Sequence, residues 1–64
     1  MSDYARNLVA SIAREMFTAF IEGGEQAAID TLDNEALAIA NSHGELAFLQ
    51  EHATAAYRAL QATL

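Results

Sequence analysis

The residues in this chain that could bind a metal ion lie in its last third. They are two histidines, His43 and His52, and two glutamates, Glu45 and Glu51. Imidazole and carboxylate groups together suit zinc or iron, but two ligands share a helix face only when they are three or four residues apart. Neither histidine has a carboxylate at that spacing, and the chain has no cysteine. We therefore predict no metal site and no cofactor.

Catalytic groups are equally sparse. Acid–base catalysis by paired carboxylates needs a concave pocket in which burial raises the pKa of one partner, and a helical domain of 64 residues has little room for such a pocket. Any catalytic triad built on Ser11, Ser42 or the threonines would depend entirely on tertiary contacts, because no known triad pattern appears in the sequence. We predict that the protein is not an enzyme.

One pair of residues resembles part of a DNA-binding helix–turn–helix. Ala40 and Gly44 have the four-residue spacing found between the small helix residue and the turn glycine of that motif. A recognition helix over Glu45 to Ala53 would present Glu45 and Glu51, with no Lys or Arg, to the phosphates. An ordinary capped turn is therefore expected, without direct binding to nucleic acid.

Acidic residues dominate the charge of the chain. The net charge is −6, and eight acidic residues with no basic one lie between Arg14 and Arg58. This excess predicts an acidic surface that binds a basic protein partner. The residues expected to form it are Glu22, Glu25, Asp30, Asp33 and Glu35. The alternative is a face that only solvates the protein, with Glu25 placed to favour a helix N-terminus.

The elements that must position these residues are all helices. Proline is absent and alanine is abundant, and apolar residues recur every three or four positions. The pattern predicts helices over about 3–22, 25–41 and 45–63. Ser2 or Asp3 can cap the first helix, and Ser42 with Glu45 fits a capping box for the third.

The connections between these segments are short. Gly23-Gly24 is expected to end the first helix, because glycine adopts the left-handed conformation found at helix C-termini. The second helix should bury Ile29, Leu32, Ala36 and Ile39. Asp33-Asn34 could interrupt it and give four helices, since both residues favour caps and turns.

The first helix carries an apolar stripe that is wide for a single partner helix. A chain of this length buries only about 60% of the surface of its unfolded form, so self-association would supply additional burial. We therefore expect a homodimer. The residues expected to contribute are Met16, Phe17, Phe20, Ile21 and Tyr57.

These observations predict a single all-α domain over residues 1–64, a small antiparallel three-helix bundle. Its apolar runs are too short to cross a membrane, and we expect a cytoplasmic protein. The function expected is protein–protein interaction, as an inhibitor or regulator of phage type, such as an anti-CRISPR protein, that occupies a basic surface of a larger macromolecule. The alternatives are a structural or oligomerisation module, and the antitoxin or anti-activator partner of a basic protein.

Overall fold

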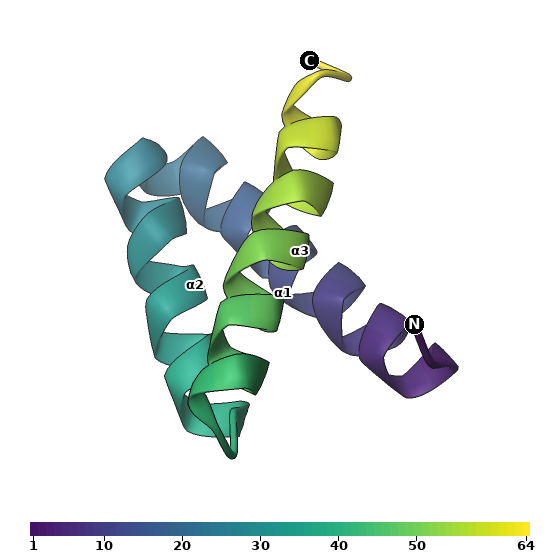
Figure 1. Cartoon of the computed structure of the whole chain (residues 1–64). Helices are drawn as coiled ribbons and strands as arrows, with labels where there is room; N and C mark the ends of the chain where they lie inside the picture. The colour runs from purple at the N-terminus through teal and green to yellow at the C-terminus, as the bar shows by residue number, and fades with distance from the viewer.

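Three helices packed together make up the computed structural model, which describes residues 1–64 (Figure 1). They are α1 (Asp3–Gly23), α2 (Glu25–Ile39) and α3 (His43–Gln61). The chain is 86% helical and contains no strand. The prediction of an all-α fold with three helices is confirmed. None of the helices combines the length and the apolar character needed to span a membrane.

Serine residues form the N-caps of two of the helices. Ser2 Oγ accepts the Ala5 N–H at 3.1 Å, and Ser42 Oγ accepts the Glu45 N–H at 3.1 Å. Glu45 Oε2 in turn accepts an N–H at 2.9 Å, but from Asn41 and not from Ser42. The capping box at α3 is therefore shifted by one residue from the usual reciprocal pair.

A single residue, Gly24, makes the reversal between α1 and α2. Its φ of 86° and ψ of −174° place it in a backbone region that side-chain-bearing residues avoid. Its N–H donates to the Phe20 carbonyl at 2.8 Å. Gly23 is the last residue of α1, and a Cβ there would lie 3.0 Å from the Cβ of Ala27. Gly24 thus needs glycine for its conformation, and Gly23 needs it for space.

The second helix is continuous from Glu25 to Ile39. Asp33 and Asn34 do not interrupt it, so the four-helix alternative is wrong. Leu32 before the pair and Ala36 after it are both buried. Their packing maintains the helix through two residues of low helical propensity, because tertiary contacts override that propensity.

Ten buried apolar residues form the core, and Tyr57, Ile12 and Met16 are the largest of them that are fully buried. The prediction that α2 buries Ile29 is wrong, because this side chain is 38% exposed. The buried stripe of α2 runs instead through Ala28, Leu32 and Ala36. Ile29 is one residue beyond Ala28 and therefore points about 100° away from that stripe.

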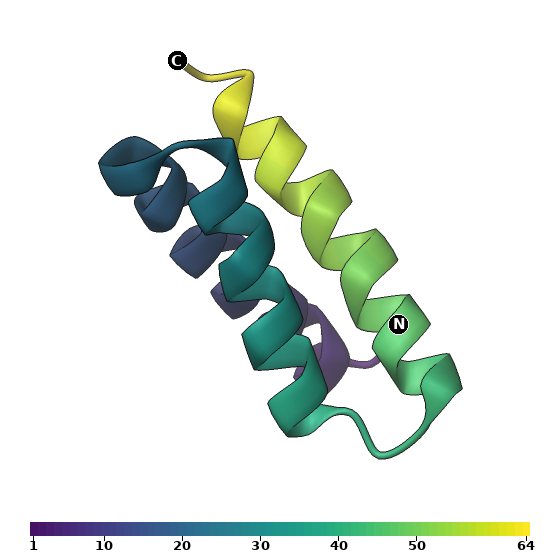
Figure 2. The same cartoon turned by 90° about the vertical axis from the view of Figure 1, so that its left-hand side faces the viewer.

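The helices do not all run alongside one another. In both views α2 and α3 lie side by side, and the loop between them lies at one extremity of the molecule (Figures 1 and 2). Helix α1 crosses behind α3, and its first turns extend past α3, away from α2 (Figure 1). The N-terminal part of α1 is therefore less covered than the rest.

Candidate functional site

The five residues predicted to form an acidic surface do not lie on one face. Asp30 is exposed and accepts a hydrogen bond from Gln26 Nε2 at 3.0 Å, whereas Asp33 and Glu35 are half-buried. Residues two apart on a helix point about 200° from each other. Asp33 and Glu35 therefore flank opposite sides of α2, and the acidic charge is spread around this helix.

Glu35 lies beside a carboxylate of α1. Burial raises the pKa of Glu15 above its ordinary value of 4.5, and the nearby carboxylate of Glu35 raises it further. Two carboxylates at close range repel each other, which favours the protonated form of Glu15. Glu15 was not among the predicted site residues, and no spacing along the chain relates it to Glu35.

A shallow polar hollow of about 440 Å³ lies between α1 and α2 next to this pair. Glu15, Glu22 and Thr31 line it, together with Arg14. Arg14 forms no ion pair with the acidic residues around it. Nowhere in the chain do three or more histidine or acidic side chains gather closely enough to hold a metal ion.

Glu25 has a structural contact that its sequence neighbours do not suggest. Its Oε1 lies 2.9 Å from Nη1 of Arg58, and its Oε2 accepts hydrogen bonds from Tyr57 Oη at 3.3 Å and Gln61 Nε2 at 3.4 Å. Glu25 begins α2, and these partners lie at the end of α3. The sequence prediction left Glu25 without a counter-charge, and folding supplies one from a distant position.

The same end of the bundle is tied by aromatic contacts. The Phe20 ring of α1 packs edge-on against Tyr57 with ring centroids 6.1 Å apart. The Arg58 guanidinium lies 5.3 Å from the centre of the Tyr57 ring. Burial raises the pKa of the Tyr57 phenol, and the Glu25 carboxylate adds to that effect. We call this region the closed end, defined by Phe20, Glu25, Tyr57, Arg58 and Gln61.

The residues predicted for self-association separate into two groups. Met16 is 1% exposed and Tyr57 is 0% exposed, so both belong to the core of one chain and offer no surface to a second. Ile21 is 59% exposed, and Phe17 and Phe20 are half-buried with ring centroids 6.4 Å apart. Only the last three can contact another molecule without rearrangement of the core.

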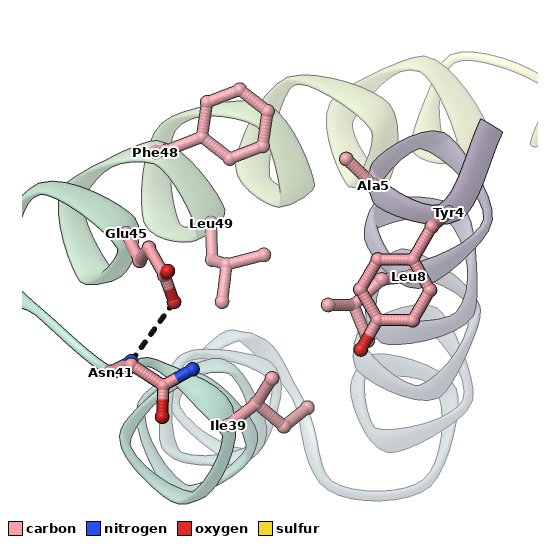
Figure 3. A pocket seen from close by; sticks show the side chains of 8 residues that line it. All are labelled: Tyr4, Ala5, Leu8, Ile39, Asn41, Glu45, Phe48 and Leu49. Carbon is pink, nitrogen blue, oxygen red and sulfur yellow. Dashed lines mark hydrogen bonds between the residues drawn. The ribbon is translucent and has the colours of Figure 1, made fainter. Parts of the chain in front are cut away.

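An apolar groove of about 290 Å³ lies at the opposite end of the bundle (Figure 3). Side chains of Leu8 from α1, Ile39 from α2 and Leu49 from α3 converge on it. Tyr4, Ala5 and Phe48 complete the apolar lining. We call this groove, with Asn41 and Glu45 at its polar side, the open end.

Glu45 is the only charged residue that lines the groove. Its Oε2 accepts the Asn41 N–H, and this bond closes the polar side of the groove (Figure 3). Tyr4 is 74% exposed, so its ring leaves most of its surface available to another molecule.

The sequence prediction missed this groove. Its residues come from three helices. The periodicity within each helix identifies these residues as apolar, but it does not show that they meet at one groove. The one available signal was Phe48, which lies outside the regular apolar seam of the third helix. Comparison with protein-family models, curated proteins and solved structures finds no match to this chain.

Proposed function

We propose that the protein acts in the cytoplasm by protein–protein interaction, as an inhibitor or regulator that occupies a basic surface of a larger protein. The observation that carries this proposal is the uncompensated charge. Nine acidic side chains form only two ion pairs, Asp3 with Arg6 and Glu25 with Arg58. The remaining carboxylates have no cationic partner in the chain: Glu15, Glu22, Asp30, Asp33, Glu35, Glu45 and Glu51.

A basic partner would relieve a specific repulsion. Glu15 and Glu35 are close enough to raise the pKa of Glu15 in the free protein. A Lys or Arg placed beside them would favour the ionised form of Glu15. Long-range attraction between the acidic protein and a basic surface would also accelerate association. Inhibitors of this kind include phage-encoded proteins such as anti-CRISPR proteins, and that class remains our expectation.

The test of this proposal is the response of binding to charge and salt. The variant Glu22→Gln/Asp30→Asn/Glu35→Gln removes three unpaired charges and alters no buried side chain of the core. A partner captured from the native cell with the wild-type protein should bind this variant more weakly. The affinity of the partner for the wild-type protein should also decrease when the salt concentration is raised from about 0.05 to about 0.5 M, because ions screen exposed charges. Equal affinities for both proteins at both salt concentrations would contradict the proposal.

The quaternary structure is a separate part of the proposal. We infer an antiparallel order of the three helices and a homodimer that forms through Phe17, Phe20 and Ile21. The exposed Ile21 and the half-buried Phe17 support this surface, because an apolar cluster on a small protein often marks an interface. Sedimentation equilibrium should give a dimer mass for the wild type and a monomer mass for Ile21→Ser. A monomeric wild type would contradict it.

The exposed Ile21 beside the half-buried Phe17 also favours a second candidate function, an oligomerisation module whose acidic face only solvates it. Under that function, the three charge substitutions would change neither the dimer mass nor any partner binding. Under the first function, the same substitutions would leave the dimer mass unchanged and would weaken binding of the partner protein.

A further inference from the structure

The groove at the open end is apolar and unfilled by the chain itself. Leu8, Ile39 and Phe48 line it and are only partly buried, and the buried Leu49 lies at its base. The groove exists because α1 crosses α3 at an angle and its first turns diverge from α2 (Figure 1). Tyr4 lies at the side of the groove and is 74% exposed (Figure 3).

The size of the groove limits what can enter it. Pockets for drug-sized ligands measure about 300–1,000 Å³, and a groove of about 290 Å³ falls just below that range. One or two bulky apolar side chains of a macromolecular partner fit this volume better. Grooves between helices commonly receive such anchor side chains from an amphipathic segment.

The charge of the groove lining favours one kind of partner segment. The lining has no cation, and its one charged group is Glu45. Glu45 Oε2 already accepts the Asn41 N–H, while Oε1 accepts no hydrogen bond within the chain. A Lys or Arg next to the anchor side chain would therefore find an available carboxylate oxygen in a protein of net charge −6.

A second copy of the chain matches this requirement poorly. It carries the same net charge of −6, and two of its three arginines are already paired, Arg6 with Asp3 and Arg58 with Glu25. Arg14 is the only one left, and it lies in the acidic hollow with Glu15 and Glu22. Seating a second copy in the groove would bring together two chains of net charge −6, with Arg14 as the one unpaired cation available to approach Glu45.

We propose that the open end is a docking site for a basic segment of a protein partner, which inserts one bulky apolar side chain into the groove and places a Lys or Arg beside Glu45. The proposal rests on the proposed function and adds to it a specific anchor point. The acidic surface supplies attraction over distance, and the groove supplies the short-range contact that holds the partner in register.

The test uses synthetic peptides and the full chain. The main probe is a labelled helical peptide of about four turns, built from Ala and Lys with one central Leu. Two matched peptides replace that Leu with Ser, or every Lys with Glu. Fluorescence anisotropy measures affinity, and amide shifts of the labelled protein locate the site.

We expect the basic Leu peptide to bind at least about tenfold more tightly than its Ser version, because the Leu side chain removes apolar surface from water when it enters the groove and Ser does not. Two variants should reduce its affinity to that of the Ser peptide. Tyr4→Ser removes the exposed ring, and Ala5→Met fills the groove from within. Glu45→Gln retains an acceptor for the Asn41 N–H and should weaken only the basic peptides. The matched control is Leu64→Ser, at a residue 75% exposed outside the groove, which should bind like the wild type.

Each contrary result has a distinct meaning. Equal affinity for the Leu and Ser peptides, or no binding of the basic Leu peptide, would overturn the groove proposal and leave the charge-based function standing. Equal binding of the acidic and basic Leu peptides would overturn the choice of a basic partner, and with it the proposed function. If Tyr4→Ser converted a dimer to a monomer in sedimentation, the occupant would be a second copy and the proposal would be wrong.

Discussion

The two ends of the bundle contrast in how fully the three helices contact one another. At the closed end, Phe20 of α1 packs on Tyr57 of α3, and the Glu25 carboxylate of α2 lies 2.9 Å from the Arg58 guanidinium. At the open end, the helices diverge around a groove of about 290 Å³, with Tyr4 largely in solvent. Under our proposal, the contacts that stabilise the fold and the groove that binds the basic segment are separated in space. Substitutions at one end should change folding, and substitutions at the other should change binding.

The two tyrosines give the largest expected difference. Tyr57 is 0% exposed and Tyr4 is 74% exposed. Tyr57→Ala should lower the unfolding free energy by about 3–5 kcal/mol, as truncation of a buried aromatic ring does. Tyr4→Ala should change it by less than about 0.5 kcal/mol. Urea denaturation of both variants measures the contrast, and similar losses for the two would show that the ends do not differ as described.

The glycines give a second contrast. Gly24→Ala should destabilise the protein by about 1–3 kcal/mol, because the φ of 86° with extended ψ is strained for alanine. Gly44 lies in the first turn of α3, where an added Cβ would meet only Ser42 Oγ at 3.8 Å. Gly44→Ala should therefore stabilise by about 0.4–1 kcal/mol. Thermal denaturation should give melting temperatures that move in opposite directions, and a rise for Gly24→Ala would refute the turn geometry.

The ion pair between Glu25 and Arg58 at the closed end should contribute less to the unfolding free energy than its short N–O distance suggests. The Arg58 side chain is 55% exposed and the Glu25 side chain is 41% exposed, so solvent screens their attraction. A double-mutant cycle with Glu25→Gln and Arg58→Gln should yield a coupling energy of about 0.2–1 kcal/mol at low salt. A coupling of several kcal/mol would mean that this end is drier than its exposed fractions indicate.

The smallest expected effect is on the pH dependence of stability. The folded-state pKa of Glu15 is raised by burial and by Glu35 above the ordinary value of 4.5. Between the unfolded and folded pKa values, the folded protein binds more protons than the unfolded protein does. The unfolding free energy therefore falls as the pH rises through this window. Glu15→Gln should remove that decrease, as measured by urea denaturation across the window. A variant whose pH profile matches the wild type would show that the two carboxylates do not interact.

Much of the fold could be predicted from the sequence, because its determinants are local. Serine caps, the turn glycine and apolar periodicity act within four residues of one another. They place three helices whose ends agree with the structure to within about two residues. The exact buried stripe of α2 was less certain, since Ile29 and Ala28 are adjacent and only packing decides which one faces the core.

The candidate sites depend on contacts between distant residues, and for that reason the sequence predicted them poorly. The pairing of Glu25 with Arg58 and the approach of Glu15 to Glu35 join different helices. The groove needs the crossing angle of α1, which no periodicity reports. The acidic excess is a property of composition, and the structure places Asp33 and Glu35 on opposite sides of α2 instead of on one face.

The most direct test of the central claim is an amide-shift titration of the labelled protein with the basic Leu peptide. Our account predicts that the shifts concentrate at the open end, around Leu8, Phe48 and Leu49, with little change at Glu25 and Tyr57. Shifts concentrated at the closed end, or spread evenly over the three helices, would contradict it.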